Sequence, residues 1–282
     1  MNDDPSGSAG RALRAHWSHY LIEAGGLGIF MLIAGLAATV LEAPHSVLHM
    51  ALPNALLRRA LMGLAMGGTA AALVYSPWGK RSGAHFNPAL TLAFLYARKV
   101  RAWDAFFYIL AQCIGGVAGV LVVLAICGDA FALAPVSDIV TVPGQYGVAA
   151  AFCAEWAISF GLMSLVLYAS NRKRWAPYTG VACGVLIALY VTFEAPVSGM
   201  SMNPSRTIAS ALPSGIWDAA WIYFVAPITA MISATVVYRL LNNNSAVGCA
   251  KLNHAQLDHC IFICAYVSAA PAVASGSAAE SV

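Results

Sequence analysis

Charged residues are scarce in this sequence. Asp, Glu, Lys and Arg make up 10% of its 282 residues, whereas hydrophobic residues make up 60%. Soluble globular domains are about 25% charged, so this composition excludes an ordinary soluble domain. The net charge of only +3 at pH 7 gives no reason to expect a nucleic-acid partner. The composition indicates a lipid bilayer as the surroundings of the chain.

Cysteine is absent from the predicted outer loops. Four of the seven cysteines fall within apolar runs and three lie near the C-terminus. A disulfide framework is therefore not indicated. The apolar runs also lack a nucleophile–base pair and paired metal ligands, which disfavours an enzyme. No cofactor is expected.

Runs of about 20 largely apolar residues recur along the chain, each long enough to cross about 30 Å of hydrocarbon as a helix. They are 20–41, 57–76, 102–127, 148–169, 177–195 and 218–241. These runs predict an all-α membrane protein with six spans. Its membrane domain covers 16–241, between a polar N-terminal segment at 1–15 and a tail at 242–282.

Basic residues gather on one side of the membrane if the predicted spans alternate in direction. By the positive-inside rule, this bias places both termini in the cytoplasm and makes the chain a multi-pass protein of the cell (inner) membrane. Arg58 and Arg59 fall on the other side. The residues that carry the bias are Arg11, Arg14, Lys80, Arg81, Arg98, Lys99, Arg101, Arg172, Lys173, Arg174, Arg239 and Lys251.

A short motif occurs twice, as Ala-His-Phe-Asn-Pro-Ala at 84–89 and Met-Ser-Met-Asn-Pro-Ser at 200–205. Asn is a favoured helix N-cap, and Pro is favoured at the first helical position. Each copy leads into an apolar run too short to span a bilayer. The motif therefore predicts two re-entrant half-helices that begin at membrane depth, with Asn87 and Asn203 at their starts.

The two motif copies occupy matching places in two halves of the chain, about 20–127 and 148–241. Each half has three predicted spans, and an odd number inverts the second half relative to the first. The half-helices then enter from opposite leaflets, with their positive N-terminal ends at the midplane. Irregular backbone at that depth is tolerated where it lines a cavity or is buried in protein. These features favour a pore or a transporter.

The segments Ser-Gly-Ala-His-Phe-Asn-Pro-Ala at 82–89 and Asn-Pro-Ser-Arg at 203–206 resemble the motifs of the aquaporins and glycerol facilitators, the major intrinsic proteins. The resemblance covers about 20–241. It implies six tilted helices, half-helices that meet at a central constriction, and a homotetramer with one pore per protomer. It also implies that the Asn87 and Asn203 amides donate hydrogen bonds to a passing neutral solute, while protons and ions are excluded. Ser205 replaces the usual Ala, a mild change.

The resemblance further implies a wall of backbone carbonyls and an outer constriction. A charged side chain at membrane depth is costly unless it faces water or a partner, which also marks Arg206 as functional. The carbonyls belong to Gly83, Ala84, His85, Gly199, Met200 and Ser201. Spacing from the motifs assigns the constriction, or selectivity filter, to Gly67, Val191, Met200 and Arg206. A slip of one residue in the alignment of the second span would instead put Met66 or Gly68 at the first of these positions.

The predicted filter residues give mixed indications of the solute. Gly67 and Val191 stand where strict water channels have Phe and His, so the filter should be wider and more apolar, although Met200 refills part of the space. Thr207 and Trp217, in contrast, resemble the residues of water channels rather than glycerol facilitators. Water is the expected solute, and glycerol, urea, hydrogen peroxide and undissociated metalloid acids stay open.

Glu23 and Glu155 lie within the first and fourth predicted spans. They are either anchors that accept hydrogen bonds from loop backbone, or relay groups of a proton-coupled secondary transporter of a small solute. Their matching places in the repeat favour anchors. His85 is either a structural histidine, which we favour, or a pH sensor.

The tail contains five potential zinc ligands within a short stretch: Cys249, His254, His259, Cys260 and Cys264. A disulfide is not expected on the reducing cytoplasmic side. Because the spacings match no compact zinc-finger pattern, we favour a tail whose Cys-Ile-Phe-Ile-Cys segment lies on lipid, and metal binding is the alternative. The Ala/Ser-rich residues 268–282 are expected to be unstructured.

Overall fold

The computed structural model describes residues 8–242, 247–254 and 260–265, and the regular elements within them are helices. The long helices of this part are α1 (Ala9–Glu42), α3 (Ala55–Tyr75), α6 (Ala102–Cys127), α8 (Gly147–Ser170), α9 (Thr179–Phe193) and α12 (Ile222–Leu241). Two half-length helices follow the repeated motifs, α5 (Pro88–Tyr96) and α11 (Pro204–Ser214). Short helical segments in the connections are α2 (Val47–Ala51), α4 (Pro77–Ser82), α7 (Asp129–Ala132), η1 (Ser137–Ile139), η2 (Ala176–Tyr178) and α10 (Ala195–Ser198). The predicted fold class is confirmed.

Two helix boundaries differ from the expectation by more than two residues. α1 begins at Ala9, where the Ser8 side chain caps it by accepting a hydrogen bond from the Arg11 backbone N–H. Residues 9–15 therefore belong to the first helix, which begins 11 residues before the predicted span 20–41. α12 begins at Ile222, because residues 218–221 form a turn.

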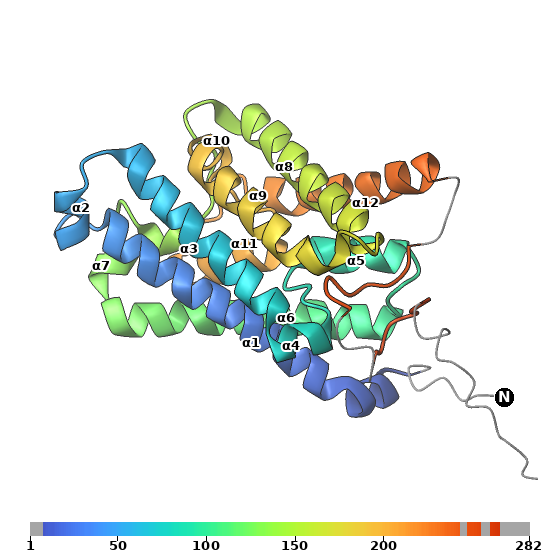
Figure 1. Cartoon of the computed structure of the whole chain (residues 1–282). Coiled ribbons are helices and arrows are strands. Elements are labelled where there is room, and N and C mark those ends of the chain that lie inside the picture. The colour runs from blue at the N-terminus through green and yellow to red at the C-terminus, as the bar shows by residue number, and fades with distance from the viewer. Residues whose placement is uncertain (1–7, 243–246, 255–259, 266–282) are drawn as a thin grey trace, which may run out of the picture.

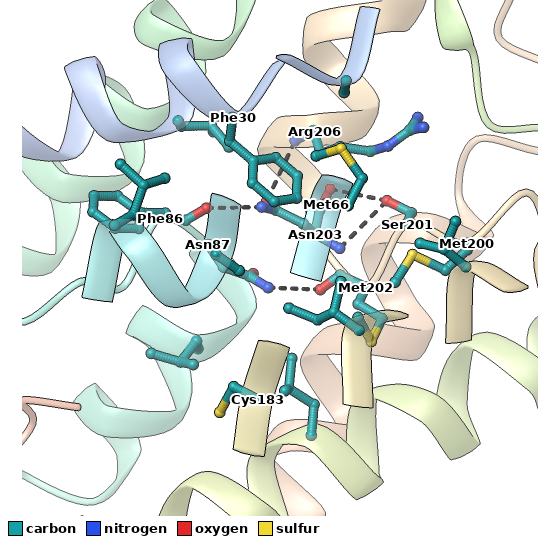
Figure 2. Close-up of a pocket in the computed structure, with 18 of the residues that line it drawn as sticks. Phe30, Met66, Phe86, Asn87, Cys183, Met200, Ser201, Met202, Asn203 and Arg206 are labelled. Carbon is teal, nitrogen blue, oxygen red and sulfur yellow. Dashed lines mark hydrogen bonds between the residues drawn. The ribbon is translucent and has the colours of Figure 1, made fainter. Parts of the chain in front are cut away.

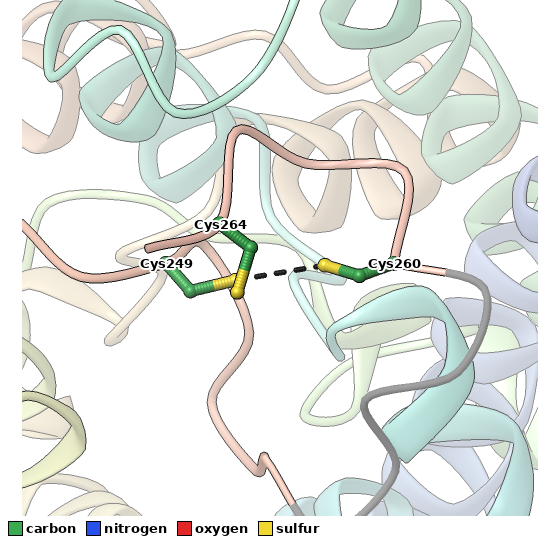
Figure 3. A group of neighbouring side chains, drawn as sticks. All are labelled: Cys249, Cys260 and Cys264. Atoms are coloured by element: carbon green, nitrogen blue, oxygen red, sulfur yellow. Dashed lines mark hydrogen bonds between the residues drawn. The ribbon is translucent and has the colours of Figure 1, made fainter. Parts of the chain in front are cut away.

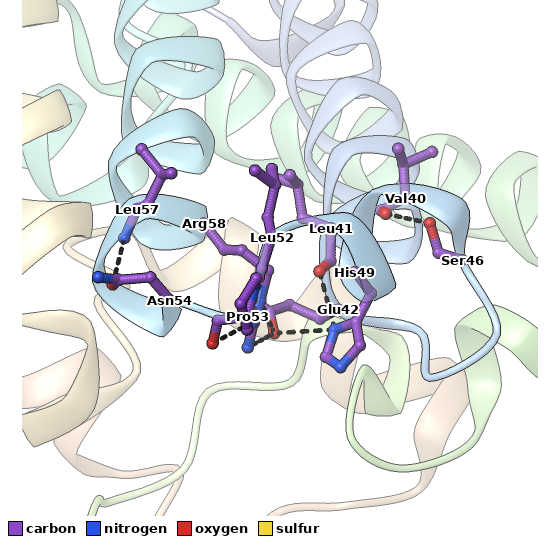
Figure 4. A network of polar contacts seen from close by, with 10 residues as sticks. All are labelled: Val40, Leu41, Glu42, Ser46, His49, Leu52, Pro53, Asn54, Leu57 and Arg58. Carbon is purple, nitrogen blue, oxygen red and sulfur yellow. Dashed lines mark hydrogen bonds and ion pairs between the residues drawn. The ribbon is translucent and has the colours of Figure 1, made fainter.

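Five helical stretches of the described chain are long and apolar enough to cross a membrane, in α1, α6, α8, α12 and η2 with α9. The remaining long helix, α3, has 21 residues but carries two arginines, Arg58 and Arg59, near its N-terminus. Arg58 pairs with Glu42 at 3.1 Å and donates to the Leu52 carbonyl (Figure 4). Arg59 donates to the Thr192 carbonyl at 3.2 Å. These contacts explain why two cations lie on the side that is otherwise poor in basic residues.

The two halves of the chain interlock as an inverted repeat. α1 packs on α6 in the first half, as α8 packs on α12 in the second, and α3 packs on α9 between the halves. Each half-helix packs against the last long helix of the other half, α5 on α12 and α11 on α6. The half-helices are thus enclosed by both halves.

The half-helices run in opposite directions from the centre of the bundle. We call the side where α1 begins and the tail lies the N-terminal face, and the side of α2, α7 and α10 the far face (Figure 1). α5 runs toward the N-terminal face, where the Lys99 carbonyl just beyond it accepts a hydrogen bond from Ile263 of the tail. α11 runs toward the far face. Both helix N-termini therefore point at the centre.

The close contact of α3 with α9 depends on glycine. A Cβ atom added to Gly67 would lie 2.1 Å from the Gly184 carbonyl oxygen, and one added to Gly184 would lie 2.5 Å from the Gly67 carbonyl oxygen. Real Cβ atoms do not approach backbone so closely, so these two positions need glycine. Gly68 has no such neighbour within 4 Å.

Gly67→Ala should lower the free energy of unfolding by about 1–3 kcal/mol, because the added methyl group forces the α3 and α9 backbones apart. Gly68→Ala is the matched control and should be neutral or slightly stabilising, since Ala favours helix over Gly. Thermal unfolding of both variants in detergent measures the difference. Equal unfolding midpoints would contradict the close α3–α9 contact.

Candidate functional site

The loops before the two half-helices share one backbone conformation. Counted back from the motif Asn, the residues four, three and one positions earlier have positive φ in both copies. They are Gly83 (95°), Ala84 (59°) and Phe86 (46°) in the first, and Gly199 (83°), Met200 (53°) and Met202 (53°) in the second. Left-handed backbone is costly for residues other than glycine, so surrounding contacts must stabilise these loops.

The motif asparagines join the two half-helix tips. Each Oδ1 accepts a hydrogen bond from the backbone of its own helix, as an N-cap does. Each Nδ2 donates to the other half: Asn87 to the Met202 carbonyl at 2.8 Å, and Asn203 to the Phe86 carbonyl at 2.7 Å (Figure 2). The predicted meeting of the half-helices at the centre is confirmed.

Glu23 fixes the loop before α5. Its carboxylate is fully buried and accepts hydrogen bonds from the His85 N–H at 3.1 Å and the Phe86 N–H at 2.6 Å. The Ser82 hydroxyl and the Gln112 amide donate to the same carboxylate. Buried N–H groups at this depth need such acceptors, so this acid has the contacts that the anchor interpretation predicts.

Glu155 fixes the loop before α11 in the same way. It is fully buried and accepts from the Ser201 N–H at 2.6 Å, the Met202 N–H at 2.8 Å and the Ser198 hydroxyl at 2.9 Å. These donors lie at positions that match those around Glu23. The two loops are therefore built by the same contacts in both halves.

A cavity of about 230 Å³ lies beside the joined tips. Asn87, Asn203 and Arg206 contribute polar side chains to a wall that is otherwise mainly apolar (Figure 2). The two motif loops also line it, through Ala84, His85, Gly199, Met200 and Ser201 of the expected carbonyl set. Gly83 is the exception, because its carbonyl accepts a hydrogen bond from Leu252 of the tail at 3.1 Å.

Arg206 is held at the cavity wall by its own surroundings. Its Nη1 donates to the Ile139 carbonyl at 2.7 Å, in the connection between the halves, and lies 3.4 Å from the Ser210 Oγ. The matching position in the first half is Leu90. The guanidinium therefore places a positive charge on the α11 side of the cavity alone.

Three of the four predicted filter residues line the cavity, namely Val191, Met200 and Arg206. Gly67 is not among its lining residues, because it faces α9; Met66 lines the wall instead. Phe30 of α1 is a further lining residue that sequence reasoning missed, since no motif fixes its spacing. Because Met66 and Phe30 line the wall, the cavity is more apolar and more crowded than the filter expected with Gly67 at this position.

His85 has the surroundings of a structural histidine. Its Nε2 donates to the Ala250 carbonyl at 2.8 Å, and its Nδ1 lies 3.1 Å from the Thr91 hydroxyl. Its ring stacks between Phe94 and Phe262, with centroids 5.2 and 5.3 Å away. Both ring nitrogens thus have partners, as the structural interpretation predicts.

The tail packs on the N-terminal face of the bundle. We call its described residues, 247–254 and 260–265, the tail cap. Ile261 and Phe262 are buried in the protein, whereas Ile263 is exposed, so the expectation that the Cys-Ile-Phe-Ile-Cys segment lies on lipid is wrong for Ile261 and Phe262. Leu252 is buried and lines the same cavity as the two asparagines. The tail cap therefore forms part of the cavity wall at the N-terminal end of the cavity, which we call its mouth.

The three tail cysteines lie together in the tail cap (Figure 3). The Cys249 and Cys260 sulfurs are 3.7 Å apart. A hydrogen bond from the Cys249 thiol lowers the pKa of the Cys260 thiol, although burial opposes this shift. Among the described residues, His254 is not part of this cluster, and His259 lies outside them.

The chain belongs to the major intrinsic protein family. The family model described as MIP, Major intrinsic protein, matches residues 14–238, which include all the long helices except the ends of α1 and α12. The fold and the joined half-helix tips described above agree with this assignment.

Several curated proteins are similar to this chain. Aquaporin NIP1-4 of Oryza sativa subsp. japonica is 33% identical over 213 residues, 75% of this chain and 72% of its own length. Putative aquaporin NIP4-1 of Arabidopsis thaliana is 35% identical over 170 residues, 60% of this chain; the chain spans 58% of that relative. The X-ray structure of the aquaglyceroporin from Plasmodium falciparum matches with a TM-score of 0.64 at 19% identity, over 81% of this chain and 96% of that one, and supports the fold.

Glu155→Gln should lower the free energy of unfolding by about 1–3 kcal/mol, because one buried N–H loses its acceptor when an amide replaces the carboxylate. Asp129→Asn makes the same chemical change at an exposed position and is the control. It should shift stability by less than about 0.5 kcal/mol. Unfolding in mixed micelles measures both, and equal stabilities would contradict the anchoring contacts.

Proposed function

We propose that the chain is a passive transmembrane channel for water and small neutral solutes. The observation that carries the proposal is the pair of half-helix tips joined by Asn87 and Asn203 beside the cavity. An amide nitrogen carries two hydrogens, and each Asn uses one to reach the other half. The second hydrogen of each side chain is the donor that a passing solute meets.

This geometry favours neutral solutes over protons and cations. A water molecule that accepts from both asparagines turns its oxygen toward them and cannot hydrogen-bond to both neighbours in a continuous proton wire. The N-terminal ends of α5 and α11 add positive potential at the same depth, and Arg206 adds a full charge nearby. A cation therefore meets electrostatic repulsion at this depth.

The proposed filter consists of Met66, Val191, Met200 and Arg206, with Phe30 beside it. The methionines are flexible, so the filter adapts to solutes of different shape. Water is the main proposed solute. A mainly apolar wall with a single guanidinium suits small neutral solutes. Further proposed solutes of this kind are glycerol, urea, hydrogen peroxide and undissociated metalloid acids.

We extend the proposal to the setting of the channel. The bias of basic residues supports cytoplasmic termini, so that the N-terminal face is the cytoplasmic one, in a multi-pass protein of the cell (inner) membrane. Membership of the family supports a homotetramer in which each protomer has its own pore. The domain division into 16–241 and the tail 242–282 then separates the pore from its cytoplasmic cap.

The alternative is a proton-coupled secondary transporter that uses Glu23 and Glu155. A relay acid must exchange protons with solvent or substrate, whereas both carboxylates are fully buried and accept three or four hydrogen bonds each from the motif loops and their neighbours. Their contacts support anchoring instead.

Stopped-flow light scattering of proteoliposomes in metal-free buffer separates the two candidates. The channel predicts rapid shrinkage with a low activation energy and solute flux that follows only the solute gradient. Solute uptake that saturates and depends on an imposed pH gradient would replace the channel with a carrier. Empty liposomes set the baseline, and water, glycerol and urea are compared in the same preparation.

Arg206→Ala should raise glycerol and urea permeability relative to water by about threefold to tenfold, because it removes bulk and charge from the filter. Arg14→Ala removes an exposed cation near the start of α1 and is the matched control. The ratio of solute to water permeability in proteoliposomes is the readout. An unchanged ratio in Arg206→Ala would contradict a filter at this position.

A further inference from the structure

The tail cap contains a preformed group of three thiols (Figure 3). The sulfur atoms of Cys249, Cys260 and Cys264 lie within 4.8 Å of one another, and two of them are 3.7 Å apart. A tetrahedral zinc ion with Zn–S bonds of about 2.3 Å holds its sulfurs about 3.8 Å apart. The cluster therefore needs only small movements to supply three ligands, and water can take the fourth position.

The charge around the cluster suits thiolates. Lys251 is fully buried two residues after Cys249, and its positive charge acts on Cys260. Three thiolates and one divalent cation carry a net charge of −1, which one ammonium group balances. Burial of the loaded site then leaves little uncompensated charge.

The three cysteines lie next to the tail-cap residues that contact the loop before α5. Cys249 directly precedes Ala250, whose carbonyl accepts from His85, and Leu252 on the cavity wall follows soon after. Cys260 and Cys264 flank Phe262, which stacks on the same histidine. A cation bound by all three sulfurs would connect the two segments of the tail cap, 247–254 and 260–265, over the mouth.

We propose that Cys249, Cys260 and Cys264 bind a thiophilic divalent cation, with zinc as the probe, and that the bound cation holds the tail cap over the cavity mouth and closes it. The metal site rests on the geometry and surroundings of the cluster and does not depend on the proposed channel function. The closing effect rests on the proposed channel function. Metal binding that favours the capped state shifts the equilibrium by mass action, so the closed fraction rises with zinc concentration.

Zinc binding is tested on the full chain in detergent, reduced with a phosphine and stripped with EDTA. Titration against a chromophoric chelator should give one zinc per chain, and cobalt should give a thiolate charge-transfer band. Cys260→Ser and, independently, Cys249→Ser should lose both signals. Cys153→Ser removes an exposed cysteine of α8 and should bind like the wild type. No binding by the wild type, or equal binding by the tail variants, would overturn the site.

The position of the tail cap is tested by hydrogen exchange, which does not depend on transport. The Leu252 and Ile263 amides donate to the Gly83 and Lys99 carbonyls, and zinc should slow their exchange by at least about tenfold. Cys260→Ser should show no such slowing. Unchanged exchange in wild type that has bound zinc would overturn the link between the metal and the cap.

Closure is tested in proteoliposomes of the full chain, with zinc brought to both sides by an ionophore. Zinc should lower water permeability about tenfold, EDTA should restore it, and Cys260→Ser should stay permeable throughout. Unchanged flux in wild type with bound zinc would overturn the closing effect. If metal-free wild type and Cys260→Ser are both as impermeable as empty liposomes, the channel function itself fails, together with the closing effect, while the binding and exchange results still decide the metal site.

Discussion

Backbone N–H groups buried at membrane depth must find acceptors, and this requirement shapes the centre of the molecule. The loops before α5 and α11 cannot satisfy themselves, because their left-handed residues interrupt helical hydrogen bonding. Glu23 and Glu155 each accept two of these N–H groups. The conformation that results directs the Phe86 and Met202 carbonyls at the asparagines of the opposite half.

The two halves consequently depend on one another. Each half-helix packs on the last long helix of the other half, and each motif asparagine donates to the other loop. The symmetry is broken where selectivity requires it, since Arg206 occupies the position that matches Leu90. The two loops also differ in what covers them: the tail cap contacts His85, whereas Thr141 and Val142 of the connection between the halves lie against Gly199.

The half-helices were predictable because a capping Asn and a first-turn Pro act within a few residues of the helix start. The anchors were predictable because Glu23 and Glu155 occupy matching places in the two halves of the sequence. The filter was harder to predict from the sequence. Spacing from the motifs gives the depth of a residue in the membrane, but an error of one position in a helix changes the direction of the side chain by about 100°. This change of direction separates Gly67, which faces α9, from Met66 on the cavity wall. The tail cap could not be predicted, because its contact from Ala250 to His85 joins residues 165 positions apart and no local pattern encodes it.

A double-mutant cycle between Asn87→Ala and Asn203→Ala tests the joined tips most directly. Each substitution removes one of the two asparagine hydrogen bonds that join the half-helix tips. If the tips form one junction, the unfolding free energies of the single and double variants should be non-additive by about 0.5–3 kcal/mol. Additivity within about 0.3 kcal/mol would show that the two asparagines act independently and would contradict the account.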